Sequence, residues 1–297
     1  MIERLAVIGV GLIGGSFAAA LKARGAVRHV VGVGRSMANL TQARELGVID
    51  SIASAADAVR GADFILIATP VGQMAARLAE IAPLIEPRAV ITDGGSTKVD
   101  VVSAARRALG TKVAQFVPAH PIAGSDKSGA SAAMADLFVG RRTVLTPLTE
   151  NTLVTVTRVR EAWEQCGAKV VAMSASEHDA VLGITSHLPH VLAYALMHQV
   201  LSADQSGLLF DNAGSGFRDF TRLAGGQPEM WRDILLSNRT ALLAAMDSFD
   251  ASVAQLRGAI ERGDSEQLDR VFNAARMQRN AWLAQFNGRG SGYGTEG

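Results

Sequence analysis

The sequence predicts an α/β protein with a doubly wound parallel sheet in its first half and helices alone in its second. Two observations predict this division. Up to residue 173, short apolar runs rich in β-branched residues alternate with alanine-rich stretches, and from residue 174 onward no convincing strand remains. Strands that alternate with helices form parallel sheets buried on both faces, which explains why the apolar runs are continuous. A length of 297 residues is enough for about two domains.

The predicted strands are Leu5–Ile8, His29–Val33, Phe64–Ala68, Ala89–Thr92, Gln115–Ala119, Thr143–Thr146 and Lys169–Ala172. The run Lys169–Ala172 is expected to be the last strand of the same sheet. The helices predicted in this half are Gly14–Arg24, Met37–Leu46, Gly72–Ile81, Val99–Ala108 and Thr152–Gln165. Ser176–Asp179 has the small polar and acidic residues of a helix start. The long helical stretches that follow are Ala180–Val200, Met230–Ala254 and Ser265–Gln285.

A glycine motif separates the first predicted strand from the first helix. The motif consists of Gly9, Val10, Gly11, Leu12, Ile13 and Gly14. In dinucleotide-binding folds, the three glycines allow a tight turn, close approach of the pyrophosphate, and close packing of helix on strand. The helix N-terminus favours the negative charge of the pyrophosphate. A glycine-rich turn without a ligand is the alternative, but the flanking strand and helix indicate an N-terminal Rossmann-type dinucleotide-binding domain.

The end of the second predicted strand carries the residues that select the cofactor. An NAD-selective enzyme usually has Asp or Glu there, which accepts a hydrogen bond from the ribose 2′-hydroxyl. Here Gly34 holds that position, and Arg35 and Ser36 follow it. With no carboxylate to repel a 2′-phosphate, the Arg35 guanidinium and the Ser36 hydroxyl are suited to bind one. We expect NADP as the cofactor and leave NAD open; the alternative for Arg35 is an ordinary surface arginine.

Two further segments end at the same edge of the predicted sheet. Thr69 and Pro70 follow the third predicted strand, and Ser96 and Lys98 lie in the loop after the fourth. Ligands of open α/β sheets bind beyond the carboxyl ends of the strands, so Thr69 and Pro70 are expected to border the cofactor. Ser96 and Lys98 face the same crevice, although a solvated position is an equal alternative for Lys98.

Composition argues against several classes of protein. A formal net charge of +1 with no basic stripe argues against nucleic acid as a partner. The apolar runs are too short to cross a membrane, and Met1–Arg4 carries both charge signs, unlike a signal peptide, so we expect a soluble cytoplasmic protein. Cys166 is the single cysteine, which excludes an internal disulfide and a thiolate zinc cluster. No metal site is predicted, and Cys166 is expected to be a buried thiol rather than a nucleophile.

A histidine motif follows the predicted strand Gln115–Ala119. It reads His120-Pro121-Ile122-Ala123-Gly124-Ser125 and continues as Asp126-Lys127-Ser128-Gly129. The segments that accompany it farther along are Thr185–His190, Gly214–Arg222 and Pro228–Asp233. In order and spacing, these motifs closely resemble those of the prephenate and arogenate (cyclohexadienyl) dehydrogenases of tyrosine biosynthesis, over most of the chain. The departure from the commoner members is Gly34–Arg35 in place of an acid, which concerns the cofactor rather than the reaction.

The resemblance implies an oxidative decarboxylation of prephenate, arogenate or both, with hydride transfer to NADP. It makes His120 the base that takes the proton of the ring hydroxyl, with Ser96 beside it. The ring carbon that bears this hydroxyl gives a hydride to the nicotinamide, the opposite ring carbon loses carbon dioxide, and the ring becomes aromatic. A histidine suits this role because its ordinary pKa of about 6.5 lies close to working pH.

The two carboxylates of such a substrate require cationic partners. The resemblance implies Arg222 for the side-chain carboxylate, because a bidentate arginine supplies both charge and orientation. Arg218, Asp219 and Asp126 are expected to form the ion pairs around it. Prephenate has a ketone where arogenate has an ammonium, and Asp219 is placed either to meet that ammonium or to pair with its neighbouring arginines. The choice of substrate stays open.

The helical half supplies the remaining substrate contacts that the resemblance implies. Ser186 and His190 are expected at the ring or its carboxylate, and Trp231 is expected to wall the pocket. The alternative for Ser186, His187 and His190 is that they cap or satisfy a helix bend at Pro189. The alternative for Trp231 is plain core packing or a dimer contact.

The resemblance also completes the domain organisation. Residues 1–173 are expected to form the NAD(P)-binding Rossmann domain, and residues 174–286 a helical domain for substrate binding and dimerisation. The glycine-rich residues 287–297 are expected to be a disordered tail. A homodimer through the helical domain follows from the family.

Two rival functions are weighed against this one. Other two-domain NADP enzymes, such as β-hydroxyacid dehydrogenases and imine reductases, usually rely on a lysine in the helical half, yet no lysine occurs from residue 174 to residue 297. A protein that senses NADP without chemistry would explain the glycine motif but not the histidine at the end of a strand. NADP binding without turnover of any cyclohexadienyl acid would favour that second rival.

Overall fold

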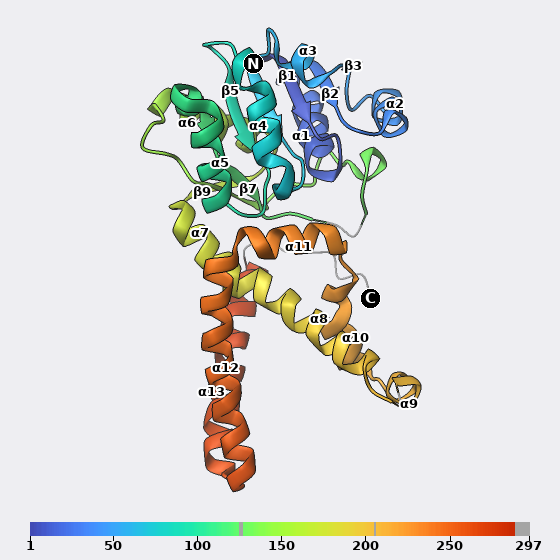
Figure 1. The fold of residues 1–297 in the computed structure, drawn as a ribbon, viewed down its shortest axis with the longest axis vertical. Helices are drawn as coiled ribbons and strands as arrows, with labels where there is room; N and C mark the ends of the chain where they lie inside the picture. The colour runs from blue at the N-terminus through green and yellow to red at the C-terminus, as the bar shows by residue number, and fades with distance from the viewer. Residues whose placement is uncertain (125–126, 205, 289–297) are drawn as a thin grey trace. The chain divides into compact units, whose positions relative to one another are not determined.

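The computed structural model describes residues 1–124, 127–204 and 206–288 (Figure 1). It divides into two compact units, one of residues 1–239 and one that begins at Thr240. The first unit holds both sheets and the helices through α11 (Pro228–Ser237). The expected fold class, a Rossmann-type domain followed by helices alone, is confirmed.

A six-stranded parallel sheet forms the centre of the first unit. Its strands are β1 (Ile2–Ile8), β2 (Val27–Val33), β3 (Ser51–Ile52), β4 (Phe64–Ile67), β5 (Val90–Asp93) and β6 (Phe116–Val117). They lie in the order β3-β2-β1-β4-β5-β6, and every neighbouring pair is parallel. The strand order reverses between β1 and β4, so the loops after these two strands open on one crevice, where such sheets bind ligands.

Helices cover both faces of this sheet. Those on one face are α1 (Leu12–Ala23), α2 (Met37–Glu45) and α6 (Leu153–Gln165), and those on the other are α3 (Ala55–Val59), α4 (Met74–Ile81) and α5 (Val99–Leu109). The single-turn helices are η1 (Val71–Gln73), η2 (Ala82–Leu84), η3 (Gly110–Gln115) and η4 (Ala130–Ala132). On the first face, the rings of Phe17 and Trp163 meet edge to face with centroids 4.6 Å apart. Cys166 is buried in the same cluster, as expected, and burial raises the pKa of its thiol.

A second sheet corrects two of the expectations. It consists of β7 (Ala119–Pro121), β8 (Arg142–Leu145) and β9 (Lys169–Ala172), with β7 antiparallel and β9 parallel to β8. Lys169–Ala172 is therefore not a strand of the main sheet, and the predicted strand Gln115–Ala119 is split between two sheets. The physical reason lies at Pro118, which has no N–H to donate to a ladder. Its carbonyl accepts a hydrogen bond from the Thr146 N–H, directly after β8 (2.9 Å).

After β9 the first unit continues with helices. They are α7 (Ala175–Leu182), the π-helical turn η5 (Gly183–His187), α8 (Leu188–Leu201), α9 (Ser206–Asp211), α10 (Ser215–Thr221), η6 (Arg222–Gly225) and α11. A capping box starts α7, because the Ser174 hydroxyl accepts from the Glu177 N–H and the Glu177 carboxylate accepts from the Ser174 N–H. The helix start expected at Ser176–Asp179 is thus the start of α7, and the predicted helical stretch Ala180–Val200 contains a π-helical turn.

The second unit consists of α12, which starts at Arg239 beside the unit boundary and ends at Arg262, and α13 (Ser265–Gly288). The helical stretch predicted over Met230–Ala254 is divided between α11 and α12, because the chain leaves α11 at Asn238, whose side chain is buried among polar groups of the first unit. The domain boundary near residue 173 stays a prediction. Of the predicted tail 287–297, residues 289–297 lie outside the described residues.

Candidate active site

The glycine motif after β1 has the shape that a dinucleotide requires. A β-carbon on Gly14 would lie 2.1 Å from the Gly9 carbonyl oxygen, and one on Gly9, which has φ +103°, would lie 2.6 Å from the Ala68 oxygen. A β-carbon on Gly11, in contrast, would meet nothing within 4 Å. Gly11 is also the N-cap of α1, without a side-chain cap and with no acid in the first turn. The N–H groups that start α1 therefore face open space, which fits a pyrophosphate.

The residues expected to select the cofactor, Gly34, Arg35 and Ser36, are exposed and follow β2. Ser36 caps α2 by accepting a hydrogen bond from the Asn39 N–H (3.2 Å). Arg35 forms no ion pair with any residue that the structure describes, so its guanidinium is available to an anion. Asn39 was missed by the sequence analysis: its side chain donates to the Val10 carbonyl and accepts from the Ala130 N–H, each at 2.7 Å. These bonds hold α2 against the glycine motif.

Other residues expected at the cofactor border the same crevice. Leu12 and Ile13 are half-buried and pack on the core, while Pro70 is exposed where η1 begins. The Thr69 hydroxyl is buried without a hydrogen-bond partner among the described residues, as expected of a polar atom that a bound group would satisfy. Ser96 is half-buried and makes no hydrogen bond to His120 among them, so its place beside the base stays a prediction.

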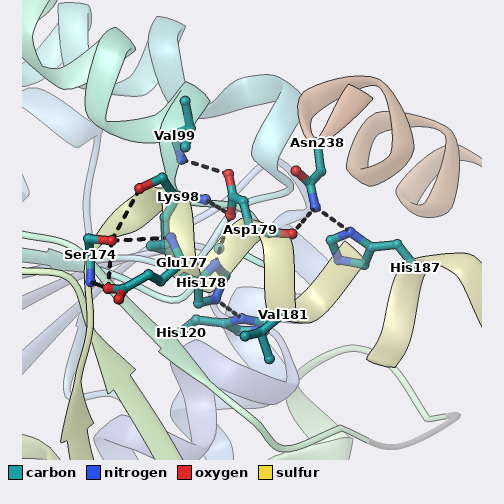
Figure 2. A network of polar contacts seen from close by, with 12 residues as sticks. Lys98, Val99, His120, Ser174, Glu177, His178, Asp179, Val181, His187 and Asn238 are labelled. Carbon is teal, nitrogen blue, oxygen red and sulfur yellow. Dashed lines mark hydrogen bonds and ion pairs between the residues drawn. The ribbon is translucent and has the colours of Figure 1, made fainter. Parts of the chain in front are cut away.

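His120 lies in the middle of β7 and begins a relay of hydrogen bonds (Figure 2). Its Nδ1 lies 2.8 Å from Nε2 of His178, and Nδ1 of His178 lies 2.7 Å from Oδ1 of Asp179. The two carboxylate oxygens of Asp179 accept the N–H groups of Lys98 and Val99, each at 2.8 Å, where α5 begins. Asp179 therefore caps α5 and orients His178 at the same time.

The alternative in which the Lys98 side chain is solvated is wrong. Its side chain is fully buried, and its Nζ lies 2.5 Å from Oδ2 of Asp93, which is also fully buried. Burial lowers the pKa of Lys98, while Asp93 and Asp179 act in the opposite direction. Asp93 also accepts from the N–H groups of Ala119 (2.9 Å) and Gly95 (2.8 Å). The pair joins the end of β5 to the start of the strand that carries His120.

The surroundings of His120 keep its imidazole neutral. Burial lowers the pKa of His120 well below its ordinary value, and the neighbouring His178, Lys98 and His187 lower it further. A neutral imidazole near neutral pH has a free lone pair, as a general base requires.

The structure brings four of the expected substrate residues together. The rings of His190 and Trp231 are stacked, with centroids 3.4 Å apart and planes 22° apart. Nδ1 of His190 donates to the Ser186 carbonyl (2.8 Å), which leaves Nε2 free to accept. Burial lowers the pKa of His190, and the charge of Arg222 lowers it too, so this exposed arginine lies near the stacked pair.

The remaining expected residues are less constrained. Arg218 is exposed and pairs with its neighbour Asp219 (3.2 Å), while neither makes another ion pair to a described residue. Ser125 and Asp126 lie outside the described residues. The alternative in which Asp219 is occupied by a neighbouring arginine is the one seen here.

The sequence analysis missed the buried end of the relay. The Asn238 side-chain amide donates to the Asp179 carbonyl (2.8 Å) and to Nδ1 of His187 (2.9 Å) (Figure 2). His187 is buried, and burial lowers its pKa to about 4. The one available signal was the adjacent pair His178-Asp179 near the start of an otherwise apolar helix, but no spacing rule connects it to His120 or Asn238.

Two general features frame the site. By length and mean hydropathy, the helical stretch Ala175–Leu201 is long and apolar enough to cross a membrane. It nevertheless carries His178 and Asp179, whose hydrogen bonds to β7 and α5 make it part of this fold. Among the described residues, no cluster of three or more His, Cys, Asp or Glu side chains could hold a metal ion.

A Rossmann domain with a cradle for a pyrophosphate, together with a neutral, half-buried histidine close to it, defines a nicotinamide-dependent oxidoreductase. Two family models match the chain: the nucleotide-binding domain of prephenate dehydrogenase over residues 17–172, and its dimerization domain over residues 174–274. The chain belongs to the prephenate dehydrogenase family.

Individual relatives are similar over nearly the whole chain. The prephenate dehydrogenase of Bacillus subtilis is 38% identical, with 94% of this chain and 76% of the relative covered. The cyclohexadienyl dehydrogenase of Zymomonas mobilis is 37% identical, with 94% and 96% covered. Among solved structures, the prephenate dehydrogenase of A. aeolicus in complex with hydroxyphenyl propionate and NAD+ is 32% identical, with 95% and 98% covered and a TM-score of 0.89.

Proposed function

We propose that this protein catalyses the oxidative decarboxylation of prephenate, arogenate or both, with NADP as the hydride acceptor. The observation that carries the proposal is the relay His120–His178–Asp179, which lies close to the cofactor cradle: a β-carbon on Gly94 would lie 2.9 Å from Cγ2 of Ile13 and 3.9 Å from Cδ of Pro121, the residue after His120. A protein that only senses NADP has no need for an oriented, neutral, half-buried histidine there.

The relay defines which nitrogen of His120 is the base. Both oxygens of Asp179 accept backbone N–H groups, so this ionised carboxylate accepts the proton of Nδ1 in His178. With a proton on Nδ1, His178 has a lone pair on Nε2, which accepts from Nδ1 of His120. That leaves the lone pair on Nε2 of His120 for the substrate. The logic is that of an Asp–His pair that fixes a tautomer and stabilises the imidazolium that forms.

The reaction needs one proton to leave the ring hydroxyl and later return. His120 takes this proton while the C–H bond of the ring carbon that bears the hydroxyl breaks. The hydride leaves with the electron pair of that bond, and a bound nicotinamide would accept it. The bond from the opposite ring carbon to its carboxylate then breaks, carbon dioxide leaves, and its electron pair makes the ring aromatic. The resulting phenolate oxygen recovers the proton from His120, so the net products are the phenol, carbon dioxide and reduced cofactor.

For the substrate, we assign Arg222 to the side-chain carboxylate and the stacked pair of His190 and Trp231 to one wall of the ring pocket. The proximity of Arg222 to His190 supports this assignment. Ser186 helps through its carbonyl, which fixes the ring of His190. Arg218 and Asp219 would lie outside this group of residues. Asp219 is three residues before Arg222 in the sequence, so its carboxylate could influence an ammonium on arogenate.

The preference for NADP rests on the loop after β2. Arg35 is exposed and without a carboxylate partner among described residues, and α2 starts beside it with no acid in its first turn. The A. aeolicus relative was solved with NAD+, so the cofactor proposed here differs from the one bound in that relative.

The same proposal includes a cytoplasmic homodimer formed through the helical domain of residues 174–286. The matched dimerization model supports it. Large apolar side chains that are exposed in this region also support it: Leu201, Leu208, Phe210, Phe220 and Leu236. The lone buried cysteine fits a reducing compartment.

The decisive experiment is to measure cofactor reduction by the purified protein with prephenate and with arogenate, each with NADP and with NAD. We expect turnover with at least one acid and a higher kcat/KM with NADP. A folded protein that binds NADPH but turns over neither acid would contradict the proposal and favour the sensor. Comparable kcat/KM values for the two cofactors would contradict NADP selectivity alone.

A variant tests the cofactor assignment directly. Removing a charge-assisted hydrogen bond to the 2′-phosphate should cost about 1.5–3 kcal/mol, so Arg35→Ala should raise the KM for NADP by about tenfold or more and leave that for NAD unchanged. Arg44→Ala, at the exposed far end of the same helix, is the matched control. Equal effects of the two variants would make Arg35 an ordinary surface arginine.

A further inference from the structure

One helix of the first unit contacts both the cofactor side and the substrate side of the crevice. This helix, α11, packs against η1, the turn that follows Thr69 and Pro70 (Figure 1). The contact is made by Asp233: a β-carbon placed on Gly72 would lie 2.5 Å from its Oδ2 and 2.9 Å from its Cγ. Nonbonded heavy atoms stay about 3.5 Å apart or more, so the carboxylate occupies the space that a side chain at position 72 would need.

The Asp233 carboxylate is held in this place. Its Oδ1 accepts hydrogen bonds from Nε (2.9 Å) and Nη2 (2.7 Å) of Arg232. The Asp233 side chain is only 16% exposed. Oδ2, which faces Gly72, has no hydrogen-bond donor among the described residues. The carboxylate therefore cannot turn away from η1 without giving up both arginine bonds.

The same helix carries the substrate wall and the buried end of the relay. Trp231, two residues before Asp233, stacks on His190. Asn238, directly after the helix, binds the Asp179 carbonyl and His187. A rigid helix that contacts η1 through one residue and the substrate wall through another transmits a shift of either contact to the other.

We propose that Asp233 is a positioning residue that couples the binding of the dinucleotide to the binding of the aromatic acid. It does so by holding η1, and with it Thr69 and Pro70, in register with Trp231. This inference rests on the proposed function for the assignment of the two ligands. Because coupling between two ligands is reciprocal, each ligand should tighten the other by the same factor in the wild-type protein and by less when the contact is removed.

The test is a binding cycle that requires no turnover. The Kd of NADPH is measured by its fluorescence, with and without a saturating amount of 3-(4-hydroxyphenyl)propionate as the probe. We expect the probe to lower the Kd of NADPH about fivefold or more in the wild-type protein. In Asp233→Ala the factor should approach one, while the Kd of NADPH alone changes little. Met230→Ala, on an exposed position of the same helix, should keep the wild-type factor.

A double variant separates a specific contact from a general loss of structure. Gly72→Ala alone should weaken NADPH binding, because the new methyl group displaces either η1 or the carboxylate. In the background of Asp233→Ala, the same substitution should add little, since the obstructing oxygens are gone. Absence of coupling in the wild-type protein, an unchanged factor in Asp233→Ala, or additive effects of the two substitutions would each overturn the inference. Failure of the turnover assay would instead overturn the proposed function.

Discussion

The two sides of the crevice are built in different ways. The cofactor side is made of backbone: three glycines within residues 9–14, the free start of α1, and the turns after β2 and β4. The base side is made of buried side chains. Its hydrogen bonds join residues 58, 59 and 81 positions apart, in the pairs His120–His178, Asp179–Asn238 and Lys98–Asp179.

This difference determines how each side responds to change. A backbone cradle depends on the absence of side chains, so its failure is steric and local. A network of buried polar groups depends on every member being satisfied, because an unpaired buried donor or acceptor retains its desolvation cost. We therefore expect substitutions on the base side to have the larger effects on chemistry, and those on the cofactor side to affect binding or packing.

The largest effect is expected at the base itself. His120→Asn should lower kcat by about 10²–10⁴, the usual contribution of general-base catalysis. The measurement is steady-state turnover with saturating NADP, accompanied by NADPH titration to show that the cofactor side is intact. A variant with near wild-type kcat would remove His120 from the mechanism.

Asp179→Asn sharpens this prediction because it keeps the imidazole in place. An amide can donate toward Nδ1 of His178 and so favour the wrong tautomer along the relay, and kcat should again fall by at least about 10². The loss should appear in kcat rather than in the Kd of NADPH. Unchanged kcat would mean that Asp179 serves only as the cap of α5.

The next effect is expected at the substrate carboxylate. Arg222→Ala should cost about 2–5 kcal/mol of substrate binding if the carboxylate is left without its partner. This cost should appear as a raised KM for the acid. Arg218→Ala, beside it but exposed and paired with Asp219, should cost less. An unchanged KM with normal turnover in Arg222→Ala would contradict the assignment.

A third effect concerns stability at acid pH. Burial lowers the folded pKa of His187 to about 4, below its ordinary 6.5; Asp179 raises it, while His178 and His190 lower it further. A lowered histidine pKa means that stability is complete above pH 6.5 and is lost as the pH falls toward 4, since the unfolded chain binds the proton first. The two values correspond to about 3 kcal/mol.

The measurement is the free energy of unfolding in urea at several pH values between 7 and 4. His187→Gln should be less stable at pH 7 but should lose less stability on acidification. His198→Gln, on an exposed position of α8, is the control and should follow the wild-type curve. Equal acid losses in all three proteins would show that His187 is not the titrating group.

The smallest effect in free energy distinguishes two glycines of one motif. Gly14→Ala forces a β-carbon against the Gly9 carbonyl and should destabilise the fold by about 1–3 kcal/mol, as overpacking does. Gly11→Ala meets no protein atom, so it should leave the unfolding free energy unchanged and weaken NADPH binding alone. Thermal melts and NADPH titrations of both variants measure this. Equal destabilisation by the two would show that Gly11 is a structural glycine.

The cofactor side could be predicted from the sequence because its signals are local. Apolar runs, glycine spacing and helix starts lie within a few residues of one another, and their steric consequences do not depend on the rest of the chain. The same locality explains why the loop Gly34–Ser36 could be recognised, whereas His120, expected just after a strand of the main sheet, lies in the middle of β7 in the second sheet. The resemblance to a family then supplied Arg222, His190 and Trp231, two of which the structure stacks together.

Local patterns were misleading where a residue's partner lay far away. The run Gln115–Ala119 looks like one strand, yet Pro118 passes it from one sheet to another. Lys98 looks like a surface lysine in a polar loop, yet it is buried on Asp93. The residues Met230–Ala254 read as one continuous helical stretch. The helix nevertheless ends at Asn238, whose side-chain amide donates a hydrogen bond to the Asp179 carbonyl.

The sequence by itself thus determined the fold class and the glycine motif after the first strand, and its resemblance to a family pointed to His120 as the proposed base. Only the tertiary structure decided which neighbours set the tautomer of that base, which lysine and aspartates are buried with it, and which helix contacts both ligands' sides. The physical reason is that steric and periodic constraints act over a few residues, whereas the satisfaction of a buried polar group depends on whatever the finished fold places within hydrogen-bonding distance.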